Sequence, residues 1–210
     1  MHYTKQEIEQ LDRVQRIKFI NAVSGVKAAN LIGTISEKGI TNVAIFNSVM
    51  HLGSDPALMG FILRPVGDVP RHTYENILKN GSYTINHVNT AIIKKAHYTS
   101  AKFDDGESEF QHCGLTEEFV DGVAAPFVKE SHLKIGLKYA ESIPIERNGT
   151  ILVIGEIEHL RIPQNAIGEA DDIDLAEINS VGISGLNTYY EVKKLERFPY
   201  VRRNEVPDFK

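Results

Sequence analysis

Apolar residues in this chain fall mostly in short alternating runs, and helical spacing is clear only near the beginning. Within residues 5–22, Ile8, Leu11, Ile17 and Ile20 recur near the 3.6-residue period of a helix, and acidic residues come early in the segment. We therefore expect an amphipathic N-terminal helix over residues 5–22.

The remaining apolar runs have the length and composition of strands. The expected strands cover residues 30–35, 41–46, 57–63, 82–88, 133–145 and 150–162. A loop carrying Gly53 and Asp55-Pro56 is expected to join the second and third of these strands. The last two are joined through Arg147-Asn148-Gly149, and Asn-Gly is a strong hairpin signal because both residues accept positive φ at low cost.

Short helices are expected over residues 73–80, 89–98 and 108–114, with Gly81 ending the first in a left-handed turn. Residues 168–179 form an acidic surface segment, and 189–207 a tail of basic and aromatic residues. Many strands, few long helices and no alternation of strand and helix favour an all-β, or β-rich α+β, closed antiparallel barrel. We expect one domain over 1–210, with the barrel at about 28–163 and a C-terminal extension over 164–210.

Composition narrows the function classes. A chain of 210 residues with 42% hydrophobic content can form a substantial core without disulfides or metals. Its net charge of −5, with both signs mixed, argues against nucleic acid or an anionic membrane surface as the main partner. The single cysteine, Cys113, excludes an internal disulfide and fits a reducing compartment. The N-terminus is too polar for a signal peptide, so we expect a cytoplasmic location.

Three polar signatures stand at the ends of apolar runs. They are NVAIFNSVMHLGSDP at 42–56, LRP followed by RHTYENI within 63–77, and TSAKF at 99–103. The first supplies amide and hydroxyl residues, and the second and third place hydroxyl residues beside an Arg or a Lys. Such residues can hold a phosphorylated, planar cofactor, with cations and hydroxyls for the phosphate and backbone amides for the ring. The eight histidines have no ligand spacing, so no metal site is expected.

Each signature also has a simpler explanation. Arg64, Thr73 and Asn76 are placed to bind phosphate at a helix N-terminus, but Thr73 could be only a helix cap and Arg64 a surface charge. The segment Asn47-Ser48-Val49 could expose backbone groups to a ring, or could be an ordinary strand end. Ser100 and Lys102 offer a hydroxyl and a cation, although a solvated lysine is the default explanation.

Taken in order, these segments resemble the flavin reductase-like, FMN-binding split-barrel family, which includes the flavoredoxins. The resemblance covers residues 30–163 and also includes SEF, CGLTEEF and AAPFVKES after the third signature. It implies that Asn47, Ser48 and Val49 line the flavin ring, that Arg64, Thr73 and Asn76 surround the phosphate and ribityl chain, and that Ser100 and Lys102 close the site.

The resemblance further implies an FMN-dependent oxidoreductase in which NADH or NADPH reduces the flavin and electrons pass onward. The partner would be a small-molecule substrate or a redox partner protein, and the assembly a homodimer. Hydride transfer demands no side-chain acid or base, so no catalytic residue is assigned. Two alternatives stay open: a non-enzymatic FMN electron carrier, and a protein that stores or senses flavin without turnover.

Overall fold

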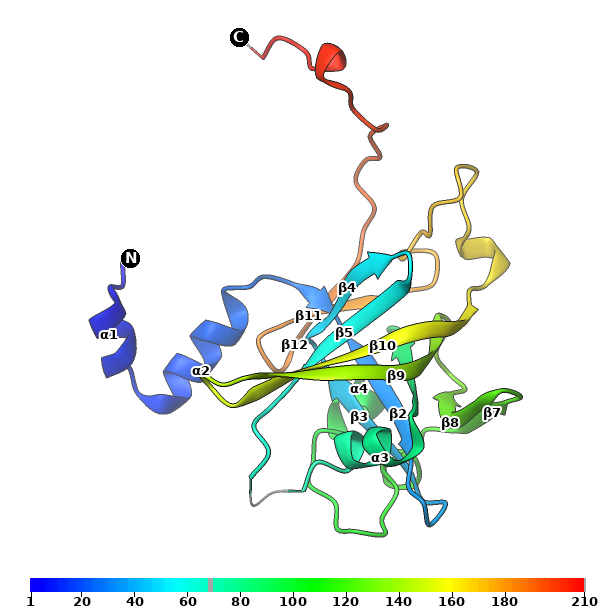
Figure 1. Cartoon of the computed structure of the whole chain (residues 1–210). Helices are drawn as coiled ribbons and strands as arrows, with labels where there is room; N and C mark the ends of the chain where they lie inside the picture. The colour runs from blue at the N-terminus through cyan, green and yellow to red at the C-terminus, as the bar shows by residue number, and fades with distance from the viewer. Residues whose placement is uncertain (68–69, 210) are drawn as a thin grey trace.

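The computed structural model describes residues 1–67 and 70–209. Its strands are β1 (Lys27–Ala28), β2 (Asn30–Ile35), β3 (Thr41–Phe46), β4 (Val49–Ser54), β5 (Ala57–Leu63), β6 (Ser82–His87), β7 (Glu117–Val120), β8 (Val123–Val128), β9 (Lys134–Ile145), β10 (Thr150–Arg161), β11 (Val181–Ser184) and β12 (Thr188–Glu191). Its α-helices are α1 (Lys5–Gln10), α2 (Arg13–Ala22), α3 (His72–Asn80), α4 (Ile93–Tyr98) and α5 (Glu109–Cys113). Short 3-10 helices cover Gln164–Ala166 and Arg203–Glu205. The long strands that we expected from alternation are present (Figure 1).

Within the described residues, seven strands form one antiparallel sheet in the order β3-β2-β6-β9-β10-β5-β4. Its two edge strands, β3 and β4, are consecutive in the chain and separated only by Asn47 and Ser48. The two edges of the sheet therefore meet at one short bend, and the sheet curls into a barrel that is split at this bend. The expected split β-barrel is confirmed.

Several local predictions are confirmed by backbone geometry. Gly81 ends α3 in the left-handed region, with φ 67°, and donates its amide to the carbonyl of Ile77. Gly149 has φ 73° in the turn between β9 and β10, where a side chain would be strained. These two glycines fix where the helix stops and where the longest hairpin reverses.

Neighbouring residues on the barrel strands belong to two separate cores. Ile32 packs inside the barrel with Phe61, Tyr83 and Leu137. The adjacent Leu31 points to the opposite face and packs in a second cluster, which also contains Val43, Ala96, Phe110 and Val181. Period-two alternation thus places one row of side chains in the barrel and the other beneath α4, α5 and β11. This outer layer brings α5 against β3, which matters for the site.

The N-terminal segment differs from the single helix expected over 5–22. It forms α1 and α2, because the side chain of Asp12 accepts from the amides of Val14 and Gln15 and starts a second helix. No residue of either helix is buried, and Ile20 on α2 is 52% exposed. Figure 1 shows both helices projecting from the barrel. The ring of Tyr3 packs edge-on against Phe19 of α2, but Val14, Ile17 and Ile20 stay exposed.

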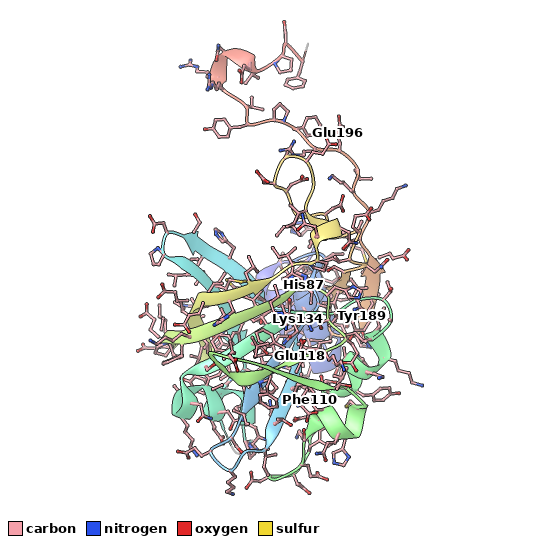
Figure 2. All side chains as sticks on the ribbon, turned by 90° about the vertical axis from the view of Figure 1, so that its right-hand side faces the viewer. His87, Phe110, Glu118, Lys134, Tyr189 and Glu196 are labelled. Carbon is pink, nitrogen blue, oxygen red and sulfur yellow. The ribbon has the colours of Figure 1, made fainter. Side chains whose placement is uncertain are left out.

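One other segment departs from expectation. The loop expected between β3 and β5 contains β4, which pairs with β5 as a hairpin on the far side of the bend. Sequence alternation is weak there because β4 is an edge strand with mostly exposed side chains. After β12 the C-terminal tail extends away from the barrel; Figure 2 shows Glu196 on this extended segment.

Candidate functional site

A cavity of about 530 Å³ opens at the split of the barrel. It lies between the β3–β4 bend, the end of β5, the start of α3 and the segment 99–105, with α5 at its base. The residues that line it include six that the sequence motifs predict for one cofactor site: Asn47, Ser48, Arg64, Thr73, Ser100 and Lys102. The three separate motifs therefore converge on one cavity.

The other two predicted residues lie elsewhere. Val49 packs against the core inside the barrel. Asn76 is buried, and its Nδ2 donates to the hydroxyl of Thr34 at 3.1 Å. Asn76 lines a neighbouring cavity instead. Their roles toward a flavin remain predictions.

Three cationic side chains line the large cavity. Arg64 and Lys102 are exposed, and neither takes part in an ion pair among residues 1–67 and 70–209. Arg71 also lines the cavity, and its guanidinium donates to the carbonyl of Pro65 at 3.1 Å. These groups bring positive charge to a lining that also holds Asp104, Asp105 and Glu109. The first turn of α3 lies in the same lining, and backbone amides at a helix N-terminus favour an anion.

The small polar side chains at the bend mostly serve the fold. Nδ2 of Asn47 donates to the carbonyl of Gly185 at 2.6 Å and thereby ties the bend to the β11–β12 turn. The hydroxyl of Ser48 bonds to both backbone groups of Ile62. Across the cavity, the Ser100 hydroxyl donates to the carbonyl of His97 at 2.7 Å. A ring bound at the bend would therefore meet backbone groups more readily than these side chains.

The cavity wall contains a buried polar cluster, of which sequence analysis assigned only Thr73 to the site. Asn42, Thr73 and Glu109 all line the cavity, and each of the three is only 6% exposed. Oε2 of Glu109 accepts from the amide of Val43 at 3.2 Å. Burial raises the pKa of Glu109 above its ordinary value. Nothing in the sequence marks Glu109, because its burial results from α5 packing on β3.

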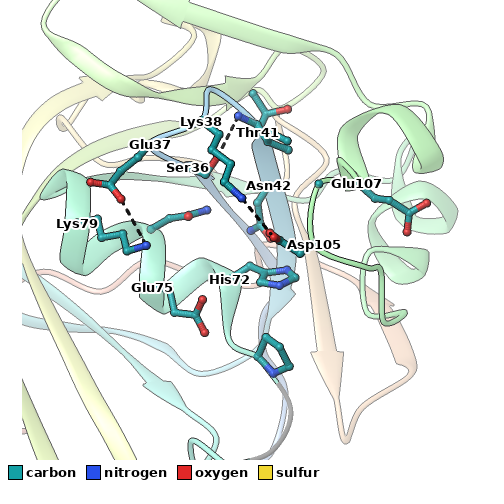
Figure 3. Close-up of a pocket in the computed structure, with 14 residues that line it drawn as sticks. Ser36, Glu37, Lys38, Thr41, Asn42, His72, Glu75, Lys79, Asp105 and Glu107 are labelled. Atoms are coloured by element: carbon teal, nitrogen blue, oxygen red, sulfur yellow. Dashed lines mark hydrogen bonds and ion pairs between the residues drawn. The ribbon is translucent and has the colours of Figure 1, made fainter.

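A second cavity of about 380 Å³ adjoins the first (Figure 3). The two share Asn42, Pro70, His72 and Asp105. Two exposed ion pairs cross the second cavity: Lys79 with Glu37 at 3.4 Å and Lys38 with Asp105 at 3.5 Å. Its lining, like that of the first cavity, carries both signs of charge.

Two classes of feature are missing from the described part of the chain. No group of three or more His, Cys, Asp or Glu side chains there is arranged to hold a metal ion. No helix within residues 1–67 and 70–209 is long and apolar enough to cross a bilayer.

Comparison with known proteins assigns the chain to a family. Residues 26–177, which include the barrel and all three motifs, match the flavin reductase like domain. The chain belongs to the flavin reductase-like family. The sequence resemblance is therefore confirmed.

Solved structures show the same fold. A putative flavin reductase with a split barrel domain from Shewanella frigidimarina NCIMB 400 is 50% identical, with a TM-score of 0.91, and the match covers 96% of this chain and 100% of that chain. Component B of nitrilotriacetate monooxygenase from Bacillus cereus is 14% identical, with a TM-score of 0.83 over 94% of this chain and 98% of that one. The flavoredoxin of Desulfovibrio vulgaris (Miyazaki F) is 23% identical, with a TM-score of 0.72 over 83% and 91%. The last two show a shared fold alone.

Proposed function

We propose that this protein binds FMN in the cavity at the barrel split and is an oxidoreductase that takes electrons from NADH or NADPH. The observation that carries the proposal is the convergence of Arg64, Thr73 and Lys102 on the cavity that the β3–β4 bend also lines. Family membership supports a flavin-related oxidoreductase. The electron donor and the phosphate-binding roles of individual residues are our proposal.

The donor set fits a phosphorylated planar group. The cavity volume of about 530 Å³ lies within the range of roughly 300–1,000 Å³ that small-molecule sites occupy. Arg64 and Lys102 supply charge for a phosphate at the mouth, and Thr73 supplies a hydroxyl at the first turn of α3. At the bend, the apolar Ala44 and Phe46 lie beside Asn47 and Ser48, a surface suited to a flat ring with polar edges.

FMN, when bound, supplies an acceptor for hydride and a carrier that can pass electrons onward. The contribution of this chain is to hold and orient it. The cations fix the phosphate end, and backbone groups at the bend can hydrogen-bond the ring edge. No side chain is required to act as an acid or base for hydride transfer, so we assign none a catalytic role.

We also propose a homodimer, because α1, α2 and the C-terminal tail leave apolar side chains uncovered. Leu195, Phe198 and Tyr200 on the tail are 89%, 70% and 91% exposed. A second copy of the chain would cover such surfaces.

Flavin titration followed by an anaerobic absorption spectrum tests the function. FMN should bind more tightly than riboflavin, which lacks the phosphate, and more tightly than FAD, whose phosphate is not terminal. Bound FMN should then bleach when NADH or NADPH is added. If bound FMN is reduced only by a partner protein and not by NADH or NADPH, the protein is an electron carrier. If FMN binds and neither donor reduces it, the protein stores or senses flavin. Equal affinity for FMN and riboflavin would contradict a phosphate pocket.

A further inference from the structure

The hairpin formed by β11 and β12 lies beyond the residues that match the flavin reductase like domain, and the proposed function gives it no role. It pairs with β1 in a three-stranded sheet that is separate from the barrel sheet. Its base is fixed to the barrel at Val181, whose amide donates to the carbonyl of Val88 at 3.0 Å and whose carbonyl accepts from the amide of Ala29 at 3.1 Å. In the described part of the chain, no residue of 181–191 lines the cavity at the barrel split.

The turn of this hairpin is bonded to one wall of the cavity, the β3–β4 bend. Nδ2 of Asn47 donates to the carbonyl of Gly185 in the β11–β12 turn at 2.6 Å. Asn47 lines the cavity, and Gly185 is 138 positions further along the chain. The bend is therefore held by a segment that lies outside the cavity.

The second strand of the hairpin is bonded to the wall across the cavity from the bend. The hydroxyl of Tyr189 on β12 (Figure 2) lies 3.0 Å from Nδ1 of His97 on α4. The carbonyl of His97 accepts from the amide of Ser100 at 3.2 Å and from its hydroxyl at 2.7 Å. Ser100 lines the cavity, whereas Tyr189 and His97 do not. The hydroxyl of Tyr189 thus holds the residue to which the wall at 99–105 is bonded.

The ring of Tyr189 is held in place independently of its hydroxyl. It packs against the buried cluster that contains Ala96, Val181 and Ile183. It also meets the ring of His97 edge-on, with the two centroids 5.8 Å apart. Phenylalanine at this position would keep these contacts and lose only the bond to Nδ1 of His97. The hydroxyl can therefore be removed while the packing is kept.

One hairpin, anchored to the barrel at its base, thus joins two walls of the cavity. In the proposed site the flavin ring lies at the bend and Lys102 on the other wall contacts the phosphate, so FMN needs both walls at one separation. Walls that are not fixed to each other sample wider openings. Binding then costs the conformational entropy of ordering them, and affinity falls although no contact with the ligand is lost.

We propose that the β11–β12 hairpin sets the separation between the bend and the wall at 99–105, and that Tyr189 is a positioning residue for the flavin, which acts through His97. This inference rests on the proposed FMN site. It gives a residue outside the cavity, and outside the matched domain, a part in cofactor affinity.

Fluorescence titration of Tyr189→Phe with FMN tests the hydroxyl. The dissociation constant should rise about three- to tenfold, the range that one neutral hydrogen bond supplies. Tyr139→Phe is the matched control, because it removes the hydroxyl of another half-buried tyrosine, which donates to Ser142 at 3.0 Å on β9, outside the cavity lining. The control should keep the wild-type dissociation constant. Because both variants lose one tyrosine hydroxyl bond, a loss of affinity confined to Tyr189→Phe is not a general effect of lower stability.

A double-mutant cycle with Asn47→Ala separates positioning from local damage. Asn47→Ala by itself releases the bend from the hairpin, so the hydroxyl of Tyr189 no longer fixes the separation of the walls. In the Asn47→Ala background, Tyr189→Phe should therefore change the FMN dissociation constant by less than about twofold. An equal fold-change of Tyr189→Phe in both backgrounds would overturn the inference, because independent effects multiply.

Hydrogen exchange in the wild-type protein requires no substitution. FMN binding should slow the exchange of backbone amides in the β11–β12 hairpin more than in the β7–β8 hairpin, which also lies outside the cavity lining. Equal slowing in the two hairpins, or a wild-type dissociation constant in Tyr189→Phe, would overturn the inference and leave FMN binding intact. Failure of the wild-type protein to bind FMN at all would overturn the proposed function and this inference together.

Discussion

The hydroxyl of Ser48 bonds to both backbone polar groups of Ile62: it donates to the carbonyl at 3.1 Å and accepts from the amide at 3.2 Å. Backbone pairing between β4 and β5 begins only at Val49. One side chain therefore replaces the strand partner that β5 loses where β3 bends into β4. Ser48 closes the barrel at its split.

Ser48→Ala should destabilise the protein by about 1–3 kcal/mol, because the amide and carbonyl of Ile62 are left without their partner. Urea unfolding followed by circular dichroism measures the change. Ser100→Ala is the control, since it removes one hydroxyl bond at an exposed position and should cost less. Equal stabilities for wild type and Ser48→Ala would mean that water replaces the hydroxyl without cost.

Arg64→Ala should weaken FMN binding by about 1.5–3 kcal/mol, the magnitude of hydrogen bonds to a charged group, and should reduce the salt dependence of the affinity. Thr73→Ala should weaken it by a similar amount with a smaller change in salt dependence. Fluorescence titration at several salt concentrations measures both. Arg147→Ala in the β9–β10 turn is the charge-matched control. Wild-type affinity in both variants would make these positions structural.

The free chain should be a dimer in solution, since α2 and the tail expose apolar side chains. Replacing Leu195, Phe198 and Tyr200 together by Ser should shift the molar mass measured by light scattering toward the monomer. The control replaces Val66 and Leu78, which are 55% and 50% exposed and lie outside the tail, by Ser. A wild-type monomer that holds FMN tightly would contradict the proposed dimer.

Stability should fall as pH drops below about 6.5, because burial lowers the pKa of His87 to about 4. As the pH falls, His87 is protonated in the unfolded chain first, at its ordinary pKa of about 6.5. The free energy of unfolding therefore decreases between about pH 6.5 and pH 4, by on the order of 3 kcal/mol in total. His87→Gln should flatten the dependence of the unfolding free energy on pH in this window. His51→Gln, at an exposed position on β4, should leave it unchanged.

The sequence by itself determined six of the seven strands of the large sheet, two of the turns and the residue types of the motifs. Alternation placed the strands at 30–35 and 41–46 correctly. Gly81 marked the end of a helix and Asn148-Gly149 the turn of a hairpin, because both depend on local backbone preferences. The order of the motifs was enough to point to the flavin reductase-like family. The residue types of Arg64, Thr73 and Lys102 indicated phosphate, even though these residues are far apart in the chain.

Only the tertiary structure decided which polar residues work together. Ser48 completes a strand pair with a residue 14 positions away. Val49 and Asn76 share motifs with cavity residues yet face the core and the second cavity. Glu109 carries no local signal, because its burial depends on α5 docking against β3. Contacts between residues distant in sequence depend on the packing of whole elements, and no short motif encodes that packing.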